Sequence, residues 1–86
     1  MNNTRFMEKA KKAVGDWYGV EGPAPEEVYI VWFCKTLQNW KALLSTDFPD
    51  KRYFEATYNG DKGEMYLDTY KKEDNTIVKD EEDNDE

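Results

Sequence analysis

The sequence feature that most constrains the fold is the apolar run VYIVWFCKT, residues 28–36. Its β-branched and aromatic residues are typical of a β-strand. Regular alternation divides the run into two faces, one with Val28, Ile30, Trp32 and Cys34 and the other with Tyr29, Val31 and Phe33. Both faces are apolar, and such a strand is usually covered on both sides. Because 86 residues make one small domain, cover for the second face is hard to supply.

One face of this strand can be covered by an amphipathic helix, which is predicted over residues 4–18. Apolar side chains recur there at helical spacing and form one stripe, made of Phe6, Ala10, Ala13, Val14 and Trp17. Asn3 or Thr4 can cap the start of this helix, and Gly19 is placed to end it.

Three further strands are predicted after the first. Residues 40–46 form the second, although a helix over 37–45 also fits the spacing of Leu37, Trp40 and Leu44. Residues 52–58 and 64–71 form a hairpin, because Asn59-Gly60 between alternating segments is a strong hairpin signal. The predicted fold class is α+β: an N-terminal helix packed on one face of a four-stranded, mainly antiparallel sheet.

The hairpin predicts a surface. With the turn centred on Gly60-Asp61, Ala56 pairs with Met65 and Phe54 with Leu67 on the core side. The opposite face then pairs Thr57 with Glu64, Glu55 with Tyr66 and Tyr53 with Asp68. Together with the strand-end tyrosine, the predicted partner-binding residues are Tyr53, Glu55, Thr57, Glu64, Tyr66, Asp68 and Tyr70.

Tyrosines and carboxylates on one face are suited to protein binding. Tyrosine offers a large, rigid contact area, and carboxylates between the rings complement Lys or Arg on a partner. General acid–base chemistry also uses carboxylate pairs, but nothing in the sequence marks one of these carboxyls for burial. A merely solvated face is the alternative. We therefore expect a binding protein and no enzyme, with no catalytic residues.

The acidic residues that set the net charge of −7 are concentrated at the C-terminus. Residues 73–86 hold eight acidic residues and one basic residue, so residues 1–72 are neutral overall. We predict one α+β domain over 1–72 and a disordered acidic tail over 73–86, which either solubilises the chain or contacts a basic partner. Direct binding of nucleic acid is disfavoured, because it requires a basic footprint.

Composition excludes several chemistries. The chain has no histidine and one cysteine, Cys34, which rules out a disulfide framework, a Cys/His zinc site and a histidine-activated nucleophile. We expect no cofactor and no metal. No apolar run approaches the length of about 20 residues that a membrane span needs, and no secretory signal opens the sequence.

Two segments carry a family resemblance, VYIVWFCKTLQNWKALLST (28–46) and YFEATYNGDKGEMYLDTYKK (53–72). They resemble an uncharacterised family of small proteins, a domain of unknown function, from phages and prophages of Gram-positive bacteria. The resemblance supplies no catalytic residues. It implies a protein acting in the cytoplasm of the bacterial host, of a class whose members often inhibit host machinery or anti-phage defence.

The leading hypothesis is therefore a phage-encoded inhibitor, anti-CRISPR-like or directed against another defence. It would bind a basic, nucleic-acid-handling surface of a host or defence protein. The alternatives are a sponge for a nucleotide defence signal, with Lys35, Lys41 and Lys51 on its phosphates, and a structural accessory of the phage particle. For the second apolar face of residues 28–36, we expect a possible homodimer through Tyr29, Val31 and Phe33.

Overall fold

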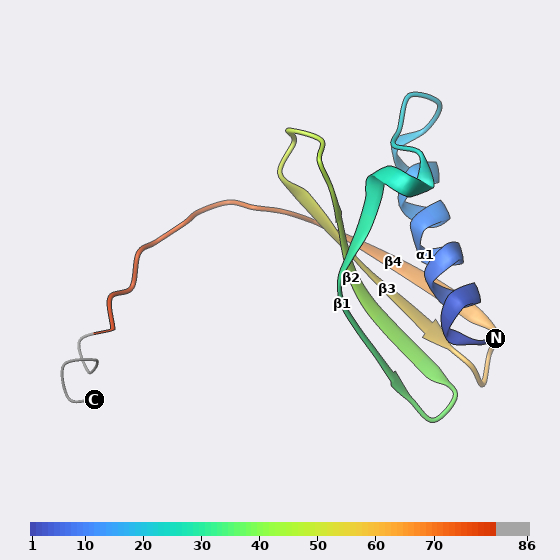
Figure 1. Cartoon of the computed structure of the whole chain (residues 1–86). Helices are drawn as coiled ribbons and strands as arrows, with labels where there is room; N and C mark the ends of the chain where they lie inside the picture. Colours follow the sequence, from blue (N-terminus) through green and yellow to red (C-terminus); the bar gives the residue numbers. More distant parts are fainter. Residues whose placement is uncertain (81–86) are drawn as a thin grey trace.

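Within residues 1–80, one α-helix lies across one face of a four-stranded antiparallel meander (Figure 1). The structure, a computed structural model, describes residues 1–80. Its elements are α1 (Asn3–Tyr18), a short 3-10 turn η1 (Pro25–Glu27), and the strands β1 (Val28–Thr36), β2 (Asn39–Thr46), β3 (Arg52–Asn59) and β4 (Glu64–Lys71). Each strand pairs with the next one in sequence, so the order is β1-β2-β3-β4. The predicted α+β fold is confirmed, and the helical alternative over 37–45 is wrong.

The ends of α1 follow from two capping residues. The Asn2 side chain accepts a hydrogen bond from the backbone N–H of Arg5 (2.8 Å), which places the cap one residue before the predicted Asn3 or Thr4. At the other end Gly19 has φ 94°, a conformation that favours glycine, and its N–H donates to the carbonyl of Gly15. The helix buries Phe6, Ala10 and Val14 against the sheet.

The core lies between α1 and the sheet. Its largest fully buried side chains are Phe6, Val14, Val28, Leu44 and Phe54. At the start of α1, the Trp40 indole N–H donates to Asn3 Oδ1 (2.9 Å), and at its end the Tyr18 ring packs on Phe48 and Phe54. Both ends of the helix are therefore fixed to the sheet, which defines a covered face and leaves the other face open.

Strand β1 carries a bulge at Val31 that changes which residues share a face. Ile30 pairs with Leu44 but Trp32 pairs with Leu43, so Val31 has no opposite residue. Beyond the bulge the alternation is reversed: Phe33 packs against the core and Phe6 (6.2 Å between ring centroids), while Trp32 is exposed. The prediction that Phe33 lies on the same face as Tyr29 and Val31 is wrong, because it assumed unbroken alternation.

The β3–β4 hairpin has the predicted faces but a different register. Ala56 pairs with Leu67, Glu55 with Asp68 and Tyr53 with Tyr70, so each partner lies two residues further along β4 than predicted. A shift of two residues leaves every side chain on its face. The predicted pairs are wrong, while the division of the hairpin into a core side and an open side is right.

The turn of this hairpin explains the shift. Asn59 Oδ1 accepts from the N–H groups of Asp61 and Lys62, and Gly63 has φ 65°, so the connection spans four residues rather than two. Gly60 is needed because of a close backbone contact, not because of a tight turn. A Cβ on it would lie 2.1 Å from the carbonyl oxygen of Gln38, because the two sheet turns at this end touch.

The described part of the tail forms no helix or strand. Lys72 donates its N–H to the carbonyl of Lys51 (3.1 Å), and residues 73–80 then extend away from the sheet with exposed side chains (Figure 1). The domain boundary at residue 72 and the disorder of the tail stay predictions. For residues 81–86 the prediction lies outside the described residues.

Candidate protein-binding face

The predicted partner-binding residues lie together on the face that α1 leaves open. On β3, Tyr53, Glu55 and Thr57 alternate with buried Phe54 and Ala56, which point toward the helix. On β4, the members of the set are exposed: Glu64, Tyr66, Asp68 and Tyr70. We name this set the tyrosine–carboxylate half of the open face. The structure brings all seven residues onto one surface.

Direct contacts order the side chains within this half. Tyr53 and Tyr70 pair across the strands, and their rings stack with centroids 5.3 Å apart. The Tyr70 hydroxyl donates to Glu55 at 3.5 Å, and the Tyr66 hydroxyl donates to the Glu64 carboxylate. Rings held by neighbours lose less conformational entropy when a partner binds.

The charges of this half are mostly negative. Lys41 on β2 approaches Glu55 at 3.5 Å, while Glu64 and Asp68 lie on the edge strand β4. The charge of Glu55, followed by slight burial and by Asp68, raises the pKa of Tyr70, and the hydrogen bond to Glu64 raises that of Tyr66. Both hydroxyls are donors beside carboxylate acceptors.

The other half of the open face, on β1 and β2, is apolar. Tyr29 is 44% exposed, Val31 59% and Trp32 50%, and Leu43 and Cys34 lie half-buried beside them. We name these five residues the apolar half. Exposed apolar residues grouped together mark interaction surfaces more often than single scattered ones do.

Sequence reasoning missed Trp32 as a surface residue. The run VYIVWFCKT offers an aromatic residue to either face, and nothing within the run marks a bulge at Val31. Which aromatic residue faces the core is decided only on folding, when Phe33 packs against Phe6 between the sheet and α1. Trp32 then lies on the open side, opposite Leu43 of β2.

The polar side chains of the open face contact one another. Its carboxylates form hydrogen bonds and ion pairs on an exposed surface, with Tyr70 and Lys41 on Glu55 and with Tyr66 on Glu64. Across residues 1–80, no group of three or more His, Cys, Asp or Glu side chains is arranged to hold a metal ion.

The lysines of the nucleotide-sponge hypothesis do not converge. Lys35 lies over the Trp40 ring (5.0 Å), at the end of the sheet where the β1–β2 turn begins. Lys41 points to the open face beside Glu55, and Lys51 lies in the β2–β3 turn at the opposite end of the sheet. The structure therefore gives these three lysines no shared phosphate site.

Comparison with known proteins identifies a family. A model described as a family of unknown function, DUF6275, matches residues 7–80. The chain belongs to the DUF6275 family. The match covers α1 from residue 7 onward, the whole sheet and the first part of the tail, and it confirms the resemblance to a domain of unknown function.

Neither the curated proteins nor the solved structures contain a match to this DUF6275 member. Among residues 1–80, no helix is both long and apolar enough to cross a membrane.

Proposed function

We propose that the chain is a non-enzymatic binding protein that docks its open face on a basic surface of another protein. The observation that carries this proposal is the tyrosine–carboxylate half, where Glu55 and Asp68 lie between the Tyr53–Tyr70 pair and Tyr66, and Glu64 follows Tyr66 at the hairpin end. Charges of this kind steer a basic partner and fix its orientation, while aromatic rings supply most of the contact area.

The partner that fits this surface is a protein that handles nucleic acid, because such proteins present clusters of Lys and Arg. Occupying that surface would exclude nucleic acid from it, which makes the chain an inhibitor. The resemblance to phage and prophage proteins supports a host enzyme or an anti-phage defence protein as the target. The proposed place of action is the cytoplasm of the bacterial host.

The apolar half extends the same contact. Trp32 and Tyr29 lie on the same face, one strand away from Glu55 and Tyr53, and tryptophan and tyrosine are common binding hot spots. The expected homodimer would use this half too, through Tyr29 and Val31, with Trp32 in place of Phe33. A two-fold dimer covering the whole face would set its carboxylates against each other or against apolar side chains, so a basic partner suits the face better.

The test reverses the charge of the face. The full chain and a variant with Glu55→Lys, Glu64→Lys and Asp68→Lys serve as baits in bacterial lysate treated with nuclease. A matched control carries the same charge change away from the open face, with Glu8→Lys, Glu21→Lys and Glu26→Lys. We expect the unaltered chain and the control to retain a basic, nucleic-acid-handling protein, and the open-face variant to lose it.

A second experiment tests whether the chain prevents the captured protein from binding nucleic acid. Purified partner and full chain are mixed, and binding of a labelled nucleic acid to the partner is measured against chain concentration. Displacement by the unaltered chain but not by the open-face variant supports the proposal. A partner retained equally by both variants, or one that still binds nucleic acid when saturated, would refute it.

A further inference from the structure

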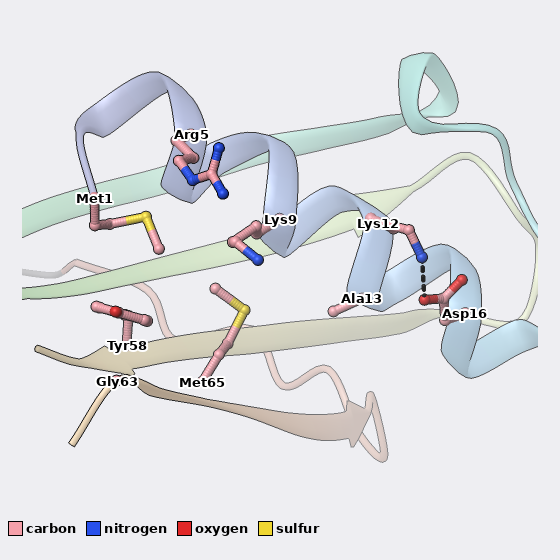
Figure 2. Close-up of a pocket in the computed structure, with 9 residues that line it drawn as sticks. All are labelled: Met1, Arg5, Lys9, Lys12, Ala13, Asp16, Tyr58, Gly63 and Met65. Carbon is pink, nitrogen blue, oxygen red and sulfur yellow. Dashed lines mark hydrogen bonds and ion pairs between the residues drawn. The ribbon is translucent and has the colours of Figure 1, made fainter.

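A second candidate site lies on the helix side of the molecule, between α1 and the edge strand β4 (Figure 2). It is a groove of about 440 Å³, and its floor is made by Met1, Ala13, Tyr58, Gly63 and Met65. None of these residues belongs to the open face. The groove therefore offers a binding site independent of the proposed function.

Three cations border this groove. Arg5, Lys9 and Lys12 follow one another at helical spacings of four and three residues, and all three line it. Figure 2 shows Lys9 and Met65 reaching toward one another from opposite sides. Asp16 is paired with Lys12 at 2.9 Å and marks the end of the groove nearest the C-terminus of α1.

A row of cations over an apolar floor fits an extended acidic peptide. Three charges spaced along about 10 Å of helix can pair with carboxylates on a chain lying beside them. Nucleic acid fits less well, because the acidic tail and the carboxylates of the open face repel its phosphates. Charge and shape thus select a carboxylate-rich polypeptide segment.

The sequence itself contains such a segment, residues 80–86, DEEDNDE. The tail leaves β4 at the end where Arg52 lies over the Trp17 ring, which is the Asp16 end of the groove. From there Arg5 is about 18 Å away along the helix axis. The 14 residues of the tail span up to about 46 Å, so the segment can reach the groove after residues 73–80 reverse from their outward course.

We propose that the α1–β4 groove binds the acidic C-terminal segment of its own chain. The tether favours this occupant over the same segment from another molecule, because short flexible linkers give effective concentrations on the order of millimolar. Docking holds Arg5, Lys9 and Lys12 against carboxylates and keeps these cations from other polyanions. It is electrostatic and is weakened by salt, which shortens the screening length from about 10 Å at 0.1 M to about 3 Å at 1 M.

Paramagnetic broadening in NMR spectra of the full chain tests this contact. A nitroxide is attached at residue 84 in a chain carrying Cys34→Ser and Asn84→Cys, so that it labels the tail alone. We expect broadening of backbone amide signals of residues 5–12 and 64–67 at low salt, and its loss at 1 M NaCl. Unbroadened groove signals at low salt would overturn the proposal.

Charge variants tie any broadening to the groove. Arg5→Glu, Lys9→Glu and Lys12→Glu together should abolish it, whereas Lys11→Glu, Lys35→Glu and Lys41→Glu make a matched change away from the groove and should leave it. Persistence in the groove variant would overturn the proposal. In a mixture of isotope-labelled chains without nitroxide and unlabelled chains with it, broadening would show docking between molecules and refute the tethered contact.

Discussion

The two faces of the sheet are made by alternate residues of the same strands, yet they have different environments. On β3, Phe54 is fully buried under α1, while its neighbour Tyr53 is 39% exposed on the open face. The covered face excludes water and is closely packed, so changes there reduce stability. The open face keeps its aromatic rings in water, which costs free energy in the isolated chain and leaves them available to a partner. Residues packed for stability and residues exposed to solvent thus alternate within single strands.

The largest effect that tests this separation is expected at Phe54. Phe54→Ala removes a ring that packs against Trp17 and Tyr18, and it should lower the free energy of unfolding by about 3–5 kcal/mol. Tyr53→Ala loses only its stack on Tyr70 and should cost about 1 kcal/mol or less. Urea unfolding followed by circular dichroism measures both. Equal losses at the two positions would show that the open face is as important to the fold as the covered one.

The same contrast can be drawn across the bulge in β1. Phe33→Ala should destabilise the chain by about 1–2 kcal/mol, because its half-buried ring packs against Phe6. Trp32→Ala should cost less than Phe33→Ala, since half of the Trp32 surface is already in water. The unfolding midpoints of the two variants decide between bulged and regular alternation. The reverse order of effects would place Trp32, and not Phe33, in the core.

The fold was predictable because local patterns were strong and agreed with one another. The stripe from Phe6 to Val14 has helical spacing, and Phe54 and Ala56 alternate with polar residues on β3. The exact pairing of the hairpin was not predictable from Asn59-Gly60 alone. A shift of two residues conserves the faces, so the hydrophobic pattern cannot distinguish the two registers. The choice depends on the Asn59 side chain and on the contact between Gly60 and Gln38.

The candidate site was predictable to the same degree. The tyrosine–carboxylate half follows from period-two alternation, which requires only that Phe54 and Ala56 be buried. Trp32 could not be assigned, because its face depends on a bulge selected by packing between β1 and α1. The groove beside Arg5 and Lys9 also needed the tertiary structure, since only the docking of α1 beside β4 creates it. Local alternation therefore predicts faces, and long-range packing decides their exceptions.

The two faces of the sheet each carry an ion pair, and we expect these pairs to differ in how much they make stability depend on pH. Asp50 accepts from the Tyr18 hydroxyl (2.7 Å) and pairs with Arg52 (2.9 Å) beneath the end of α1. Burial by itself would raise the pKa of Asp50, but these hydrogen bonds outweigh it and lower the pKa below its ordinary 3.8. The resulting stabilisation is complete above the pKa of the unfolded chain and is lost as the pH falls through the lower, folded value.

Asp50→Asn should therefore cost about 1 kcal/mol at neutral pH and remove part of the loss of stability on acidification. Glu55→Gln, which removes the more exposed pair with Lys41 on the open face, should leave that acid dependence nearly unchanged. Urea midpoints between about pH 2 and pH 6 compare the two variants with the unaltered chain. If Asp50→Asn kept the full acid sensitivity, the network with Tyr18 and Arg52 would not be its source.

The smallest effect concerns the tyrosines of the open face, whose ionisation reports their carboxylate neighbours. The negative charge of Glu55 opposes formation of a second negative charge on Tyr70 and raises its pKa above the ordinary 10.0. Glu55→Gln should bring the pKa of Tyr70 down, whereas Glu64→Gln should act on Tyr66 instead. Ring signals in NMR spectra, followed with pH, resolve the two residues. If each substitution moved both tyrosines equally, the carboxylates would act as one diffuse field, and the ordered Tyr70–Glu55 and Tyr66–Glu64 contacts would not persist in solution.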